Sequence, residues 1–127
     1  AFAGMKHAVE EGGDYVTHDL RFHQGLLRAC RNRMLVQMSK ALNALLRTSF
    51  ELSTRIQDGP RSSLPLHRAV LDAVIAHDPD RAFEASHVLI KGAGEDIDRV
   101  LASRRKLPAV TGRPTPIKSP AGLKYCL

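Results

Sequence analysis

The feature that most constrains this chain is a series of mostly apolar residues between positions 35 and 56, spaced alternately three and four positions apart. The series consists of Leu35, Met38, Leu42, Leu45, Ser49, Leu52 and Ile56. An α-helix has about 3.6 residues per turn, so this spacing returns every member to one face. It predicts one long bundle helix with an a/d-like seam. Ser49 is the polar member, and its hydroxyl either bonds back to its own helix or points into a pocket.

Turn and cap signals divide the N-terminal half into further helices. Residues 1–11 have the pattern of a helix that ends at Gly12-Gly13. Asp14 is suited to cap the next helix, which extends to Cys30. Residues 31–33 then form a short break before the long helix.

The C-terminal half carries start signals of its own. Asp58-Gly59-Pro60 predicts a turn, after which Ser63 is the expected cap of a helix with Pro65 in its first turn. Asp78 is expected to cap the last helix, with Pro79 at its first position. We find no strand alternation and no internal repeat. The sequence therefore predicts an all-α fold, an antiparallel bundle of about five helices joined by short loops.

The excess positive charge lies at the C-terminal end. The formal net charge is +6, and six of the Lys and Arg residues lie from Arg104 onward, where no Asp or Glu occurs. We therefore expect a helical domain over 1–103 with balanced charges and a flexible, disordered basic tail over 104–127. A folded face that binds DNA needs a basic stripe. The charge count indicates no such stripe over residues 1–103, although balanced overall charge is compatible with a local basic patch.

Composition favours a cytoplasmic protein. No apolar run is long enough to cross a membrane, and the N-terminus lacks a basic-then-apolar signal pattern. The cysteines, Cys30 and Cys126, form no disulfide framework, which is typical of a reducing compartment. Because the chain begins inside a helical pattern without Met, we also expect it to be a fragment of a longer protein.

Asp19 and His23 lie in the middle of an apolar helix face. That face consists of Val16, Asp19, Leu20, His23, Leu26, Leu27 and Cys30. A carboxylate and an imidazole in such a place must be hydrogen-bonded, paired or bound to a metal, because burying an unpaired charge is costly. Four residues apart on a helix, they can place an oxygen and a nitrogen on one ion. The simpler alternative is a neutral His hydrogen-bonded to Asp as a buried pair.

His67 occupies a similar position on another helix. Its inner face also carries Val70, Leu71 and Val74. A lone histidine on an apolar face is more often a satisfied core residue than a ligand. As a third member beside Asp19 and His23, it strengthens the metal hypothesis.

Three segments together resemble a known family. They are Asp19-Leu20-Arg21-Phe22-His23, the segment Leu27 to Asn32 followed by the long helix, and Leu66 to Val74 leading into Asp78-Pro79-Asp80-Arg81-Ala82. Over about residues 1–103 the chain resembles the effector-binding FCD domain of the FadR subgroup of GntR transcription regulators. Leu46 to Phe50 and Val88 to Ile97 are most similar to the sugar-acid branch, such as galactonate-type repressors.

The resemblance implies a ligand sensor and not an enzyme. Such a domain binds a small carboxylic or sugar acid, often through a divalent metal such as Zn, Ni or Mn held by an Asp and three His. It forms a homodimer and controls DNA binding by an N-terminal winged helix-turn-helix. In the family motif Asp19, His23 and His67 match three of the metal ligands.

The chain departs from this pattern in two places. The fourth ligand of the family is usually a His on the last helix, at the position that Leu89 occupies here. His87 lies two residues earlier, about 200° around the helix, and cannot replace it without a register shift. The winged helix-turn-helix and the first bundle helices are also missing, so DNA would be read only through a domain absent from this chain.

The sequence leaves two alternative functions open and offers three candidate contacts for an effector. His18-Asp19 and His77-Asp78 resemble the His-Asp dipeptides of helical metal-dependent phosphohydrolases, and a dimerisation-only fragment is the other alternative. For a carboxylate effector we expect Arg47 as the cation, because guanidinium binds carboxylates in a fork. Ser49 and Ser86 are the expected polar lining residues.

Overall fold

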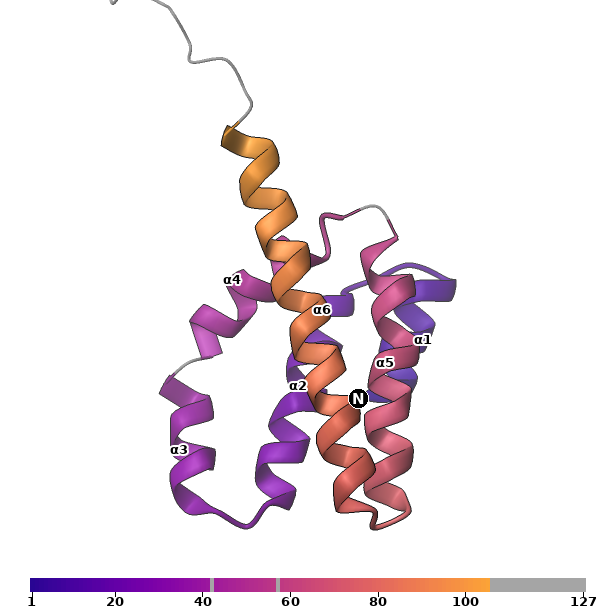
Figure 1. The fold of residues 1–127 in the computed structure, drawn as a ribbon, viewed down its shortest axis with the longest axis vertical. Coiled ribbons are helices and arrows are strands. Elements are labelled where there is room, and N and C mark those ends of the chain that lie inside the picture. Colours follow the sequence, from indigo (N-terminus) through magenta and orange to yellow (C-terminus); the bar gives the residue numbers. More distant parts are fainter. Residues whose placement is uncertain (42, 57, 106–127) are drawn as a thin grey trace, which may run out of the picture.

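The computed structural model describes residues 1–41, 43–56 and 58–105, and six α-helices lie in these ranges (Figure 1). They are α1 (Phe2–Glu10), α2 (Tyr15–Ala29), α3 (Arg33–Ala41), α4 (Asn43–Ser53), α5 (Gly59–Ile75) and α6 (Pro79–Arg105). No strand occurs in the described ranges, so the predicted all-α class is confirmed. Of the tail predicted over 104–127, Arg104 and Arg105 belong to α6 instead, and the positions from 106 onward lie outside the described residues.

The prediction of one long helix over residues 35–56 is wrong, because α3 and α4 are separate helices. The seam also fails to stay on one buried face: Met38 is 47% and Leu45 is 63% exposed. Instead, Leu46 and Phe50 face the interior cavity described below. The inner face of α4 is thus offset from the predicted seam by one residue, about 100° around the helix.

Two predicted helix starts are confirmed by their cap hydrogen bonds. The Asp14 carboxylate accepts from the Thr17 backbone N–H at 2.9 Å, at the start of α2. The Asp78 carboxylate accepts from the Arg81 backbone N–H at 3.0 Å, and Pro79 is the first residue of α6. Such caps satisfy backbone donors that the first helical turn leaves without partners.

The predicted start of α5 at Ser63 is wrong. The helix begins at Gly59, after Asp58 in a left-handed conformation, and Pro60 lies in its first turn. Proline has its φ fixed near the helical value and needs no hydrogen-bond acceptor there, so it favours the earlier start. Ser63 therefore lies inside α5, and Pro65 is an interior helix residue.

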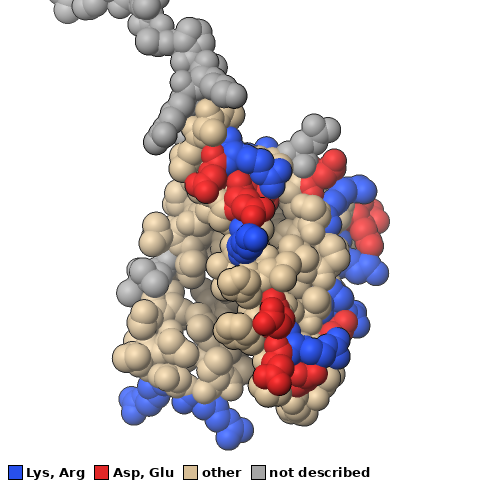
Figure 2. All heavy atoms as spheres, in the orientation of Figure 1, with Lys and Arg blue, Asp and Glu red and all other residues tan. Residues whose placement is uncertain are grey.

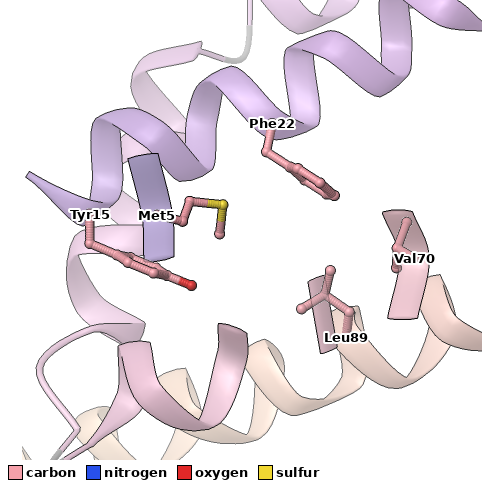
Figure 3. Packing of buried hydrophobic residues seen from close by; sticks show 5 residues of the cluster. All are labelled: Met5, Tyr15, Phe22, Val70 and Leu89. Carbon is pink, nitrogen blue, oxygen red and sulfur yellow. The ribbon is translucent and has the colours of Figure 1, made fainter. Parts of the chain in front are cut away.

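The core joins α1, α2, α5 and α6. Its buried apolar side chains are Met5, Tyr15, Phe22, Val70 and Leu89 (Figure 3). The hairpin of α5 and α6 packs along its length, and α4 packs against α2 and α6. The C-terminal part of α6 extends past the other helices at one end of the bundle (Figure 1). None of the described helices combines the length and apolarity that crossing a membrane requires.

Candidate metal and ligand site

Three side chains from two helices bring their donor atoms to one point. Oδ1 of Asp19 lies 3.2 Å from Nε2 of His23 and 3.0 Å from Nε2 of His67. The two Nε2 atoms are 3.3 Å apart. Asp19 and His23 come from α2 and His67 from α5, and α1 packs against both helices. The three side chains meet in a nearly equilateral triangle. The structure therefore brings together the three residues that the sequence singled out.

The triangle has the dimensions of one face of a metal coordination shell. A cation bound to N and O ligands at about 2.0–2.1 Å, in tetrahedral or octahedral geometry, separates neighbouring ligand atoms by roughly 3.0–3.4 Å. The three distances of 3.0, 3.2 and 3.3 Å fall within that range. Two imidazoles and a carboxylate also suit Zn, Ni or Mn chemically. The residues present thus fit a divalent cation.

The hydrogen bonds of His67 orient its ring toward that point. Its Nδ1 lies 2.9 Å from the Ser63 carbonyl oxygen, one helical turn earlier, and 3.2 Å from the Ser63 hydroxyl. Donation to a carbonyl requires the proton on Nδ1, which leaves a lone pair on Nε2 in the neutral ring. This is the tautomer that a metal ligand needs. Because α5 starts at Gly59, Ser63 is already helical and its carbonyl stands where His67 can reach it.

The electrostatics of the triangle favour a positive charge at its centre. Burial raises the pKa of Asp19, but hydrogen bonds with His23 and His67 outweigh it and hold that pKa below its usual value. Asp19 is therefore an ionised carboxylate at neutral pH. The hydrogen bond with His67 that lowers this pKa has a proton between Asp19 Oδ1 and His67 Nε2, which are 3.0 Å apart, and a bound cation would take the place of that proton.

Aromatic rings enclose the two histidines. The Phe22 ring stands edge-on to His67, with centroids 5.1 Å apart, and Phe50 of α4 lies 5.2 Å from the ring of His23. His67 is 2% exposed, whereas the side chain of His23 is partly open to solvent. Sequence reasoning missed Phe50. Its spacing of four from Leu46 was the available signal, but it fell one residue off the assumed seam.

A cavity of about 570 Å³ opens beside the triangle. All three candidate ligands line it, and residues of α2, α4, α5 and α6 form its walls. Most of the lining is apolar, and Ser63 and Ser86 add hydroxyls. This volume is that of a small-molecule site, and such sites combine apolar walls with a few polar groups. Of the three predicted effector contacts, Ser86 lies on this cavity.

Arg47 and Ser49 lie outside the lining of that cavity. The Arg47 guanidinium donates to the Thr17 hydroxyl at 3.2 Å and lies 3.7 Å from the Glu51 carboxylate. The Ser49 hydroxyl donates to the Leu45 carbonyl at 3.0 Å. Ser49 thus bonds back to its own helix, the simpler of the two expectations stated for it.

Leu89 reaches the site, as its register predicts. It is 6% exposed, belongs to the core cluster and lines the cavity beside the triangle. His87 is exposed, and its ring stacks on Phe83 at a centroid distance of 6.4 Å. The wall that α6 contributes is therefore apolar at the position where a fourth imidazole would have stood.

A smaller cavity of about 140 Å³ lies against Asp19 and is lined in part by Tyr15, Thr54 and Ser62. The Tyr15 hydroxyl is buried, and no described residue gives it a hydrogen-bond partner. Burial raises the pKa of Tyr15 to about 12, so the phenol keeps its proton. Sequence reasoning missed Tyr15, although it lies one turn before Asp19 on the same face of α2.

The two His-Asp dipeptides do not build a second site among the described residues. The His18 imidazole packs against α1, where a Cβ on Gly4 would overlap it. Asp78 is occupied in capping α6. Among the described residues, His18, His77 and Asp78 belong to no group of candidate metal ligands, in contrast to Asp19, His23 and His67.

Comparison with known proteins places this geometry in a family. The family model of the FCD domain matches residues 1–92. The chain is 33% identical over 76 residues to the galactonate operon transcriptional repressor of Escherichia coli (strain K12), a match that covers 57% of this chain and 32% of the repressor. The chain thus spans about a third of that relative's length. No solved structure matches the chain significantly. Because the family model covers most of its length, the chain belongs to the FCD domain family of transcription regulators.

Proposed function

We propose that this chain is the ligand-sensing domain of a GntR-type regulator, and that it binds a small carboxylic or sugar acid in the 570 Å³ cavity. The observation that carries the proposal is the triangle of donor atoms, with sides of 3.0, 3.2 and 3.3 Å, on the wall of that cavity. The relative that represses a galactonate operon supports a sugar acid as the effector class. A cytoplasmic location is part of the proposal, since the regulator acts on DNA.

Asp19, His23 and His67 would hold a divalent cation, Zn, Ni or Mn. Once bound, such a cation supplies a positive charge and open coordination positions for carboxylate oxygens. The apolar side chain of Leu89 leaves the α6 side of the triangle without a protein ligand. Ser86 offers a hydroxyl to the effector on the same side, and the apolar walls exclude water from the bound acid.

Signalling would follow from the helices that share the cavity. The effector contacts α4 and α6, which are distant in sequence from the ligands on α2. In a homodimer, an effector with higher affinity for one arrangement of the helices shifts the population toward it. That arrangement would set the spacing of N-terminal winged helix-turn-helix domains, outside this chain, on operator DNA.

The metal half of the proposal is tested by elemental mass spectrometry on protein purified without chelator. We expect about one Zn, Ni or Mn per chain, and loss of that metal in His23→Ala and in His67→Ala. His87→Ala is the matched control, because it removes an exposed imidazole outside the triangle. Parent protein that stays metal-free after reloading with all three ions would refute the metal site.

The effector half is tested by thermal shift with hydroxy acids and sugar acids. A ligand that binds only the folded state raises the melting temperature by mass action. We expect the melting temperature to rise with the acids and not with the matching neutral polyols. In His67→Ala we expect no rise with either. A shift of equal size for acid and polyol would exclude recognition of the carboxylate.

A further inference from the structure

The connection between α2 and α3 carries positive charge without any acid nearby in sequence. No Asp or Glu occurs between Asp19 and Glu51, and this stretch contains six Lys and Arg residues. Three of them, Arg28, Arg31 and Arg33, surround the connection, and we call them the α2–α3 corner. All three are exposed. The balanced overall charge of the helical part conceals this local excess.

The cations of the corner differ from most others on the described surface in having no ion pair. Other cations pair with acids one turn away, as Lys6 does with Glu10 at 3.7 Å and Arg68 with Asp72 at 2.8 Å, whereas Arg21, Lys40, Arg55 and Arg61 are described without an ion pair. No described acid pairs with Arg28, Arg31 or Arg33. Figure 2 shows Lys and Arg atoms gathered over this end of the molecule, at the lower left, without the red atoms that accompany them elsewhere.

The backbone of the corner is specialised as well. Arg31 adopts a left-handed conformation with φ of 54°, a position at which Gly or Asn would be less strained. Arg31 and Arg33 border a surface hollow of about 250 Å³, together with Val36 and Gln37. The Asn32 side chain accepts from the Met34 backbone N–H at 2.9 Å and starts α3 between the two arginines. The turn thus fixes two guanidinium-bearing residues around one hollow.

We propose that the α2–α3 corner contacts the phosphate backbone of duplex DNA. Guanidinium groups bind phosphate oxygens through paired N–H donors, and all three corner cations are arginines. Cations without acidic partners release DNA counterions on binding at no cost in broken ion pairs. Contacts of this kind position a protein on DNA and carry no base-sequence information.

The choice of DNA rests on the proposed regulatory function, since a regulator domain works beside a duplex. The corner adds to it a direct contact from the ligand-sensing domain itself. A winged helix-turn-helix outside this chain would still supply the sequence specificity. Arginines that contact phosphates but no bases predict an affinity for duplex DNA that depends strongly on salt concentration and weakly on the base sequence.

The test is fluorescence anisotropy of a labelled duplex titrated with this chain at several salt concentrations. The corner variant is Arg31→Asn with Arg33→Gln, and Asn tolerates the left-handed backbone. The matched control is Arg55→Asn with Arg61→Gln, which removes the same charge from two exposed residues without an ion pair on another part of the described surface. Circular dichroism verifies that both variants fold.

We expect the corner variant to bind the duplex about tenfold more weakly at low salt. The slope of log K against log salt should fall by about 2, since each lost phosphate contact removes about 0.9. The control should stay within about twofold of the parent. Equal losses in both variants would assign the binding to net charge and overturn the proposal, as would no loss in either.

A parallel titration with inorganic phosphate by calorimetry separates a small-anion site from a DNA contact. Loss of phosphate binding in the corner variant without loss of duplex binding would overturn the DNA assignment. Metal content and the effector shift are measured on the same variant. The triangle lies apart from the corner, so both values should match those of the parent protein. A wrong DNA proposal can therefore be distinguished from a wrong ligand-sensing proposal.

Discussion

At the scale of single residues, the site depends on one carboxylate oxygen shared by two imidazoles. Asp19 Oδ1 faces His23 on its own helix and His67 on α5, and the Ser63 carbonyl fixes the proton of His67 on the far nitrogen. The spacing of Asp19 and His23 was readable in the sequence because a helix fixes the relation of residues four apart. The Ser63 contact was not, since it depends on where α5 begins.

Leu89→His is the direct test of whether a fourth ligand can be added on α6. Leu89 already lines the cavity beside the triangle, so an imidazole there would complete the set of an Asp and three His that the resemblance implies. Outer-shell partners alone change metal affinity by about 10–100-fold, and we expect at least about tenfold tighter binding from a fourth direct ligand. Competition with a chromophoric chelator measures the change.

Leu89→Ala is the control for that experiment, since it opens the same space without adding a ligand. With metal stripped away, Leu89→His should melt below the parent, because a buried imidazole without a partner replaces apolar packing. Metal affinity of Leu89→His no higher than that of Leu89→Ala would show that position 89 does not face the ion.

At the scale of elements, close packing of α1 on α2 positions one end of the site. Gly4 of α1 lies against the His18 imidazole, and Met5 beside it is fully buried in the core. Tyr15 and Phe22 of α2 join Met5 in the same cluster (Figure 3). The face of α2 that carries Asp19 and His23 is therefore held in place by contacts that α1 makes on neighbouring faces.

Gly4→Ala should loosen this contact. The added Cβ overlaps the ring of His18, so the helices must separate or the ring must move. We expect a loss of about 1–3 kcal/mol in the free energy of unfolding, as for overpacked cores. Urea denaturation followed by circular dichroism measures it.

Gly25→Ala is the matched control on α2, because a Cβ there meets nothing within 4 Å. It should stabilise the protein by about 0.5–1 kcal/mol through helix propensity alone. If the double change Gly4→Ala with His18→Ala recovers stability, the overlap is the cause. Equal effects of Gly4→Ala and Gly25→Ala would show that α1 does not pack on His18 in solution.

At the scale of the whole molecule, the triangle joins α2 and α5 across the bundle. These helices are separated in sequence by α3 and α4, and His67 is 48 residues from Asp19. A cation bound to both helices would bind the folded chain and not the unfolded one. Metal binding and global stability are therefore coupled.

Chelation should lower the melting temperature of the whole domain. At a free metal concentration of about 100 times Kd, the bound ion contributes about 2.7 kcal/mol to the free energy of unfolding. Differential scanning calorimetry with and without chelator measures this increment. In Asp19→Asn we expect the increment to vanish, and an unchanged increment there would place the ion at another site.

The periodicities, and the residues that share a helix face, can be read from the amino-acid sequence alone. The same holds for the all-α class, the caps at Asp14 and Asp78, and the Asp19 and His23 pair, because each depends on short-range spacing within a helix. His67, 48 residues from Asp19, was added by its place on an apolar helix face and by the family resemblance. Only the tertiary structure shows that Arg33–Ala41 and Asn43–Ser53 are separate helices and that Phe50 faces the site. It also decided that Ser63 orients His67 and that Arg28, Arg31 and Arg33 form an acid-free corner. These features depend on where helix axes change direction and on contacts between distant segments, which periodicity does not encode.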